Sequence, residues 1–308
     1  MHPKHPLANQ AFNSTFRLQK PGTALCLLGC FFLFFLVIAG VLLPNIQRLV
    51  NRPEAAIKIS VVIQDLFIFI IPAVATAMIA TRLPARLLCI DKWPRPNMLI
   101  LSIIVFLCSI PAMNAIIEWN KSWHLPESLA ALETYFRQLE EGTEATSRIL
   151  MNGATIPSLI VSVLIVGVLA GFSEELFFRG AFQSIFGQTR VNQHVVVWCV
   201  ALIFSLFHLQ LFGLIPRMLL GAFFGYLLWW SKSLWLPIIL HVLNNSIVVI
   251  AEYFNNNTTG EGPGSSLKID NIGADLSSPA SLFIVATSFI LTALGIYLIY
   301  RQSKNNQL

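Results

Sequence analysis

Residues 154–186 read ATIPSLIVSVLIVGVLAGFSEELFFRGAFQSIF, an apolar run with two adjacent carboxylates and an arginine in its second half. A helix of this length extends about 50 Å, which exceeds the ~30 Å hydrocarbon core of a bilayer. Ionisable side chains at membrane depth are costly and usually face a bundle interior or a water-filled cavity. The run therefore predicts a long membrane helix that carries a functional site.

The spacing of the three ionisable residues indicates how they are used. Glu175 and Arg179 are four residues apart, so they can meet on one helix face and neutralise each other. Glu174 points about 100° away from Glu175 and needs a different partner. The structural alternative is an ion pair that only holds helices together. The partners available on later helices are His208, His241 and Asn245.

The composition is that of an integral membrane protein. The chain has 308 residues, of which 56% are hydrophobic and 11% charged, whereas soluble domains have about 25% charged residues. The formal charge of +5 comes from basic residues scattered in short loops, which indicates membrane topology and not nucleic-acid binding. The lipid bilayer is therefore one expected partner.

The apolar segments predict an all-α, polytopic membrane bundle with about eight transmembrane helices. The first helix is expected to end at Pro44. The expected spans are residues 24–43, 57–80, 98–117, 154–186, 194–212, 216–230, 234–251 and 281–300.

Two further patterns concern helix surfaces. Residues Pro126–Leu139 place apolar side chains at helical spacing within an acidic segment, which favours a helix lying in the membrane interface. Gly167-x-x-x-Gly171 and Gly221-x-x-x-Gly225 offer small-residue faces on which another helix can pack closely.

The chain divides into three expected regions. They are an N-terminal membrane region with three spans and an acidic amphipathic loop (1–153), a catalytic helical core (154–251), and a polar loop with the final span (252–308). With eight spans, the basic stretches all fall on one side: 1–23, 81–97 and 301–308. The positive-inside rule then places both termini in the cytoplasm of a multi-pass protein of the cell (inner) membrane.

The polar residues of the core are expected to converge. A hairpin with its turn near 187–193 puts Glu174 and His208 at similar depth. His241 follows a tight turn on the same side, and Asn245 lies one helical turn further on. A carboxylate and an imidazole can hold and deprotonate a water molecule, and a His–Asn pair can donate to a developing oxyanion. Together these groups suit the hydrolysis of an amide bond.

Three motifs carry a resemblance to a known family: Glu174-Glu175-x-x-x-Arg179, Phe204-x-x-x-His208 and His241-x-x-x-Asn245, in this order on successive helices. The pattern resembles the CPBP family of intramembrane proteases, which contains the CAAX prenyl endopeptidases of Rce1 type and bacterial Abi-type proteins. The resemblance covers roughly residues 155–250. It implies an intramembrane endopeptidase in which Glu174 and His208 handle the catalytic water. It also implies that Glu175 and Arg179 orient the site, and that His241 and Asn245 stabilise the oxyanion.

The sequence leaves the metal question and two other functions open. Glu174, His208 and His241 could form a three-ligand zinc site, although there is no His-Glu-x-x-His motif, and a metal-independent water is slightly favoured. No other cofactor is expected. The same polar cluster could serve a non-catalytic membrane chaperone or immunity protein. A proton-coupled transporter with a carboxylate–histidine relay is the third alternative, but the chain lacks two matching halves.

Overall fold

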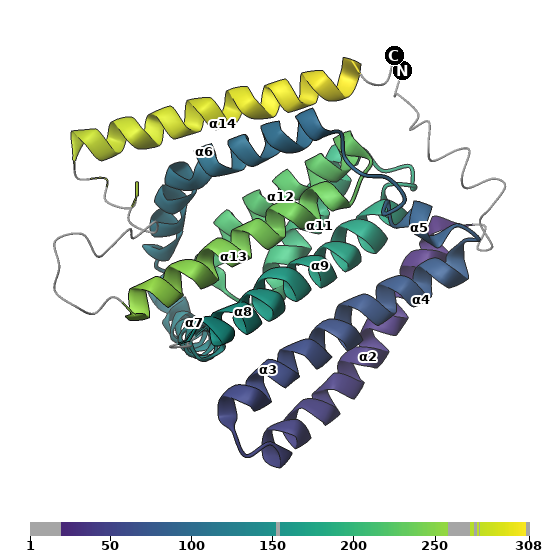
Figure 1. Ribbon diagram of the computed structural model, residues 1–308, viewed down its shortest axis with the longest axis horizontal. Helices are drawn as coiled ribbons and strands as arrows, with labels where there is room; N and C mark the ends of the chain where they lie inside the picture. Colours follow the sequence, from purple (N-terminus) through teal and green to yellow (C-terminus); the bar gives the residue numbers. More distant parts are fainter. Residues whose placement is uncertain (1–19, 152–154, 258–271, 274–275, 277, 306–308) are drawn as a thin grey trace.

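The computed structural model describes residues 20–151, 155–257, 272–273, 276 and 278–305 (Figure 1). The regular structure of these residues is helical, without strands. Seven of the described helices are long and apolar enough to cross a membrane, and an eighth apolar helix, α11 (Gln193–Phe207), is shorter. The expected all-α polytopic bundle is confirmed.

The first span, α2 (Pro21–Leu49), continues through Pro44, so the expectation that Pro44 ends this helix is wrong. Proline removes a backbone donor. The side chain of Asn45, directly after the proline, adds a hydrogen bond to this turn: Nδ2 donates to the Val41 carbonyl oxygen at 2.7 Å. The helix ends only where Val50 adopts an extended conformation.

The second span packs against α2 and forms one side of the bundle. Its three consecutive parts make one helix from Pro53 to Ala80. They are α3 (Pro53–Gln64), the wider π-helical turns η1 (Asp65–Ile70) and α4 (Ile71–Ala80). A short helix, α5 (Pro84–Leu87), follows.

The third span, α6 (Pro96–Lys121), is bent in Figure 1 and packs along the last span, α14 (Pro279–Asn305). The bend has a local cause besides the proline inside this helix. Ser288 of α14 donates to the Cys108 carbonyl oxygen at 2.5 Å and accepts from the Ala112 N–H at 3.1 Å. A hydroxyl inserted into the backbone ladder is a known source of helix kinks.

The acidic segment between the third and fourth spans is helical, as its periodicity predicts. A 3₁₀ turn, η2 (Glu127–Leu129), leads into α7 (Ala130–Met151). This helix lies wholly within the described residues, and none of its side chains is buried. Its position in the membrane interface stays a prediction.

The fourth span is one continuous helix of 31 residues, Ile156–Phe186, so the long helix expected from the opening run is confirmed. It alternates α-helical and wider π-helical parts: α8 (Ile156–Ser162), η3 (Val163–Leu169), α9 (Ala170–Glu175), η4 (Leu176–Gln183) and α10 (Ser184–Phe186). Such π-helical turns are rare in proteins, and those that occur are often found at functional sites.

The next helix ends earlier than expected. The prediction of a helix over 194–212 is wrong at its end, because α11 stops at Phe207 and His208 caps it. Leu209 has a φ of 54°, and a left-handed residue commonly terminates a helix. His208 therefore lies at the start of a loop. The chain then continues through η5 (Leu211–Gly213), α12 (Leu214–Ser231) and α13 (Trp235–Asn257).

The glycine faces allow close helix packing, as expected. A Cβ atom on Gly171 would lie 3.1 Å from the Val242 nitrogen of α13, and one on Gly167 would collide with Ser246. On α12, a Cβ atom on Gly221 would lie 3.1 Å from Arg179 Nη2. These glycines bring the backbones of α12 and α13 next to the polar part of the fourth span.

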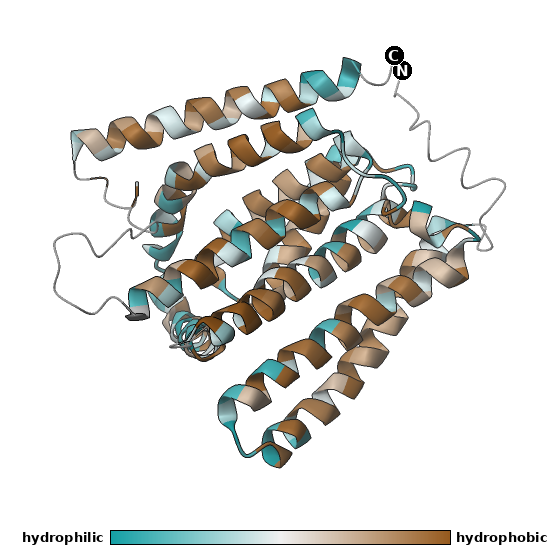
Figure 2. Ribbon diagram, viewed as in Figure 1, coloured by the Kyte–Doolittle hydropathy of each residue, from teal (hydrophilic) through white to brown (hydrophobic). Residues whose placement is uncertain are grey.

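The fourth span occupies the middle of the bundle. It contacts α13 on one side and the second span on the other, while α12, α6 and α14 follow beyond α13. Apolar residues cover the long helices, and polar ones gather at their ends and on α7 (Figure 2). The start of α2 and the end of α14 lie on the same side (Figure 1). The cytoplasmic orientation and the three-region division stay predictions, and residues 258–271 of the polar loop lie outside the described residues.

Candidate active site

Glu175 and Arg179 form the buried centre of the site. Arg179 Nη1 lies 2.8 Å from Glu175 Oε1, and neither side chain is exposed. The guanidinium also donates to the Gly221 carbonyl oxygen at 2.9 Å and lies 4.4 Å from the centre of the Phe204 ring. The π-helical part of the fourth span thus directs Arg179 to both α11 and α12, which fixes these helices around the carboxylate.

His241 of α13 connects the two adjacent carboxylates. Its Nδ1 lies 2.8 Å from Glu175 Oε1, and its Nε2 lies 3.8 Å from Glu174 Oε2. Since a carboxylate is an acceptor, Nδ1 carries a proton. In a neutral imidazole, Nε2 then carries the lone pair, so His241 donates from both nitrogens only when it is protonated.

Glu174 retains access to the space between the helices. Its side chain is 16% exposed, in contrast to the fully buried Glu175. Its charge interacts with His208 at the end of α11. The Nδ1 of His208 lies 2.9 Å from the Phe204 carbonyl oxygen, so this nitrogen carries the proton in the neutral ring and Nε2 is the basic nitrogen.

Asn245 faces the fourth span one turn away from these groups. Its Nδ2 donates to the Val166 carbonyl oxygen at 3.1 Å, and its Oδ1 accepts from Asn244 Nδ2 at 3.0 Å. The structure thus brings Glu174, Glu175, Arg179, His208 and His241 together. Asn245 holds α13 against η3, and among the residues that the structure describes it uses one of its two amide N–H groups.

Two ionisable residues at the site were not assigned to it from the sequence. Arg217, in the first turn of α12, interacts electrostatically with Glu174 and with Glu140 of α7. Asp65 of η1 is buried and interacts electrostatically with Glu174. A lone ionisable residue within an apolar span was the available signal for both. Their proximity to Glu174 follows only from how the helices pack.

The three-ligand metal set that the sequence left open, Glu174, His208 and His241, does not assemble in this geometry. Among residues 20–151, 155–257 and 278–305, no group of three His, Cys, Asp or Glu side chains is arranged to hold a metal ion. Glu175 occupies one ring nitrogen of His241, and the Phe204 carbonyl occupies one of His208. We therefore derive no step through a metal.

An aromatic cluster adjoins the buried pair through Phe204, whose ring lies against Arg179. Phe178 of the fourth span has ring centroids at 5.1 Å from Phe204 of α11 and 5.9 Å from Phe69 of η1. Phe207 contacts both Phe69 and Phe178. This apolar surrounding strengthens electrostatic interactions within the site, because the local dielectric constant is lower than that of water.

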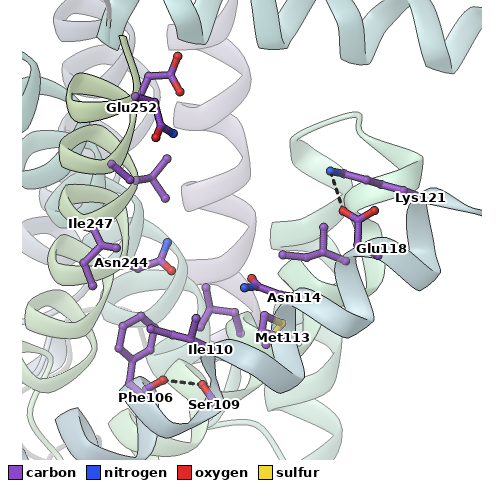
Figure 3. Close-up of a pocket in the computed structure, with 15 residues that line it drawn as sticks. Phe106, Ser109, Ile110, Met113, Asn114, Glu118, Lys121, Asn244, Ile247 and Glu252 are labelled. Atoms are coloured by element: carbon purple, nitrogen blue, oxygen red, sulfur yellow. Dashed lines mark hydrogen bonds and ion pairs between the residues drawn. The ribbon is translucent and has the colours of Figure 1, made fainter. Parts of the chain in front are cut away.

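A pocket of about 360 Å³ lies between α6, α12 and α13 (Figure 3). Its lining is mostly apolar, and the Glu118–Lys121 ion pair lies on the α6 side. Asn244, which donates to Asn245, is one of its polar lining residues. The pocket therefore reaches α13 beside the residues that contact the fourth span.

Comparisons with known proteins cover this part of the chain. Residues 156–247 match the family model of type II CAAX prenyl endopeptidases, Rce1-like. The chain is 33% identical over 116 residues to the membrane-embedded CAAX protease MroQ of Staphylococcus aureus (strain USA300). This similarity covers 36% of the chain and 45% of that relative. No solved structure matches the sequence.

The matched region coincides with the helices that carry the polar cluster, from the start of α8 to the middle of α13. All three motifs on which the resemblance was based lie within it. Residues 156–247 are thus similar to the Rce1-like CAAX prenyl endopeptidases, in agreement with the resemblance to the CPBP family that the three motifs carry.

Proposed function

We propose that this protein is an intramembrane endopeptidase that hydrolyses a peptide bond of a membrane-associated protein or peptide. The observation that carries the proposal is a buried junction in which Glu175 binds both Arg179 and His241. Glu174 lies 3.8 Å from Nε2 of this histidine, and its charge also acts on His208. The family match and the relative named a CAAX protease support it. The substrate is proposed only by class.

In the proposed reaction, Glu174 and the basic Nε2 of His208 hold a water molecule. The water oxygen attacks the carbonyl carbon of the peptide bond, and its proton passes to one of these bases. The carbonyl oxygen becomes an oxyanion. The C–N bond then breaks, and the leaving nitrogen takes up the transferred proton.

The remaining cluster residues have supporting roles in this proposal. Glu175 and Arg179 hold His241 in place. His241, when protonated, donates from Nε2, and Asn245 donates its second amide N–H to the oxyanion.

The decisive experiment removes the water-activating carboxylate. We expect Glu174→Gln to lower the cleavage rate by about 10²–10⁴, as is typical for the loss of a general base, without loss of folded protein. Substrates are identified by mapping new peptide termini in membrane fractions that contain the wild-type or the variant protein. The purified proteins are then compared on those peptides.

Glu144→Gln is the control, because it makes the same substitution at an exposed glutamate of α7. It should cleave at the wild-type rate. The proposal fails if purified Glu174→Gln protein cleaves an identified peptide as fast as the wild-type protein does.

A further inference from the structure

Arg217 is a cation at the site that the proposed reaction leaves without a role. It lies in the first turn of α12, after the loop that begins with His208. Its charge interacts with Glu174, with His208 and with Glu140. A cation whose charge acts on both proposed bases belongs to the electrostatic surroundings of the atoms that would react.

The guanidinium group is only partly engaged. Its Nη2 donates to Gln210 Oε1 in the same loop. Its Nη1 is buried and has no hydrogen-bond partner among the residues that the structure describes. The group lies against Gly213, where a Cβ atom would be 3.4 Å from Nη1. A buried donor without a hydrogen-bond partner destabilises the folded protein. Its presence here favours an interaction of Nη1 with a bound molecule.

The other hydrogen-bond donors near Glu174 either must first be protonated or lie a helical turn away. His241 donates its Nδ1 proton to Glu175, so a neutral His241 presents a lone pair at Nε2. Asn245 uses one amide N–H on the Val166 carbonyl oxygen and lies a turn away from His241. Arginine stays protonated under all ordinary conditions. Arg217 therefore offers a donor that needs no change of protonation state.

We propose that Arg217 is a catalytic residue whose Nη1 donates a hydrogen bond to the oxyanion of the tetrahedral intermediate. This inference rests on the proposed endopeptidase function. When water attacks, the electron pair of the C=O double bond moves onto the oxygen, and a positive donor stabilises that charge most in the transition state. Arg217 forms and breaks no covalent bond and transfers no proton.

The test uses the full-length purified protein and a peptide identified by the Glu174→Gln comparison. Arg217→Gln should lower kcat by about 10²–10³, the usual effect of removing an oxyanion donor, and leave KM nearly unchanged. Arg217→Lys should recover part of the loss. Arg148→Gln, which removes an exposed arginine of α7, is the control and should behave as the wild type.

Three further measurements separate catalysis from a structural role. A phosphinate analogue of the peptide, which mimics the tetrahedral intermediate, should bind Arg217→Gln more weakly by the same factor as kcat/KM falls. Methylguanidinium should restore activity to Arg217→Ala. Gln210→Leu, which removes only the loop contact of Arg217, should keep kcat within a few-fold of wild type. If Arg217→Gln does not fold, Arg217→Lys and the methylguanidinium rescue decide.

The inference is overturned if Arg217→Gln raises KM with kcat intact, or if Gln210→Leu loses as much activity as Arg217→Gln. It is also overturned if the analogue binds Arg217→Gln as tightly as the wild-type protein. An active Arg217→Gln together with an inactive Glu174→Gln would refute the role of Arg217 and leave the endopeptidase proposal standing. A fully active Glu174→Gln would refute the endopeptidase proposal itself.

Discussion

Two groups in this protein have the same composition: a glutamate, an arginine four residues later on the same helix, and a histidine from another segment. The buried group is Glu175, Arg179 and His241, and the surface group is Glu133, Arg137 and His124. In each group one carboxylate oxygen contacts both the arginine, at 2.8 Å and 2.7 Å, and the histidine Nδ1, at 2.8 Å and 3.0 Å.

Burial distinguishes the two groups. The histidine of the buried group is 6% exposed, whereas that of the surface group is 78% exposed. Water screens the charges of the surface group, so its ion pairs are expected to contribute little stability. In the buried group each charge depends on its partners, because an unpaired charge in an apolar interior is strongly unfavourable. The same residues thus form a helix-surface contact on α7 and an interhelical junction in the bundle.

Removing the arginine of the buried group should have the larger effect. We expect Arg179→Ala to destabilise the protein by about 3–5 kcal/mol, because Glu175 is left as an unpaired buried charge. Abundance in the membrane and the thermal unfolding midpoint of the purified protein measure the loss. Glu175→Gln combined with Arg179→Ala should recover part of it. A double variant that is no more abundant than Arg179→Ala would contradict the pairing.

Removing the arginine of the surface group should cost at most about 1 kcal/mol, the range of exposed ion pairs. Arg137 also donates to the Trp123 carbonyl oxygen and lies 3.9 Å from the centre of the Phe212 ring. A small loss of stability is therefore expected from Arg137→Ala, and it should shrink further in 1 M salt. A loss as large as that of Arg179→Ala would show that burial does not decide the difference.

The smallest expected effect is a pH dependence of the stability that the surface group contributes to the fold. The backbone N–H of Leu125, followed by Arg137 and His124, lowers the pKa of Glu133 from 4.5 to about 2. A lowered pKa in the folded state means that the ionised form stabilises the fold. This contribution is complete above about pH 4.5 and is lost as the pH falls toward 2.

Unfolding midpoints of the wild-type protein and Glu133→Gln, compared between pH 2 and 6, measure this contribution. The wild-type protein should be the more stable above pH 4.5, and the two curves should converge as the pH approaches 2. Parallel curves over the whole range would contradict the assignment of the shift to Glu133.

Much of the candidate site could be predicted from local spacing. Glu175 and Arg179 are four residues apart on one helix, and helical geometry alone brings them together. The membrane class followed from the apolar runs, since most of them were long enough to span a bilayer. The glycine pairs indicated where helices approach closely, because only small residues permit that distance. Each of these inferences depends on residues within a few helical turns of one another.

The sequence alone therefore determined the helical membrane class, most helix positions and the identity of the polar residues, because these depend on short-range periodicity and on the cost of placing polar groups in lipid. Only the tertiary structure decided which nitrogen of His241 faces which carboxylate, that His208 leaves the helix, and that Asn245 turns to the Val166 carbonyl oxygen. It also decided that Arg217 lies near Glu174. These arrangements depend on contacts between segments far apart in the chain, where packing and hydrogen bonding fix the position of each side chain.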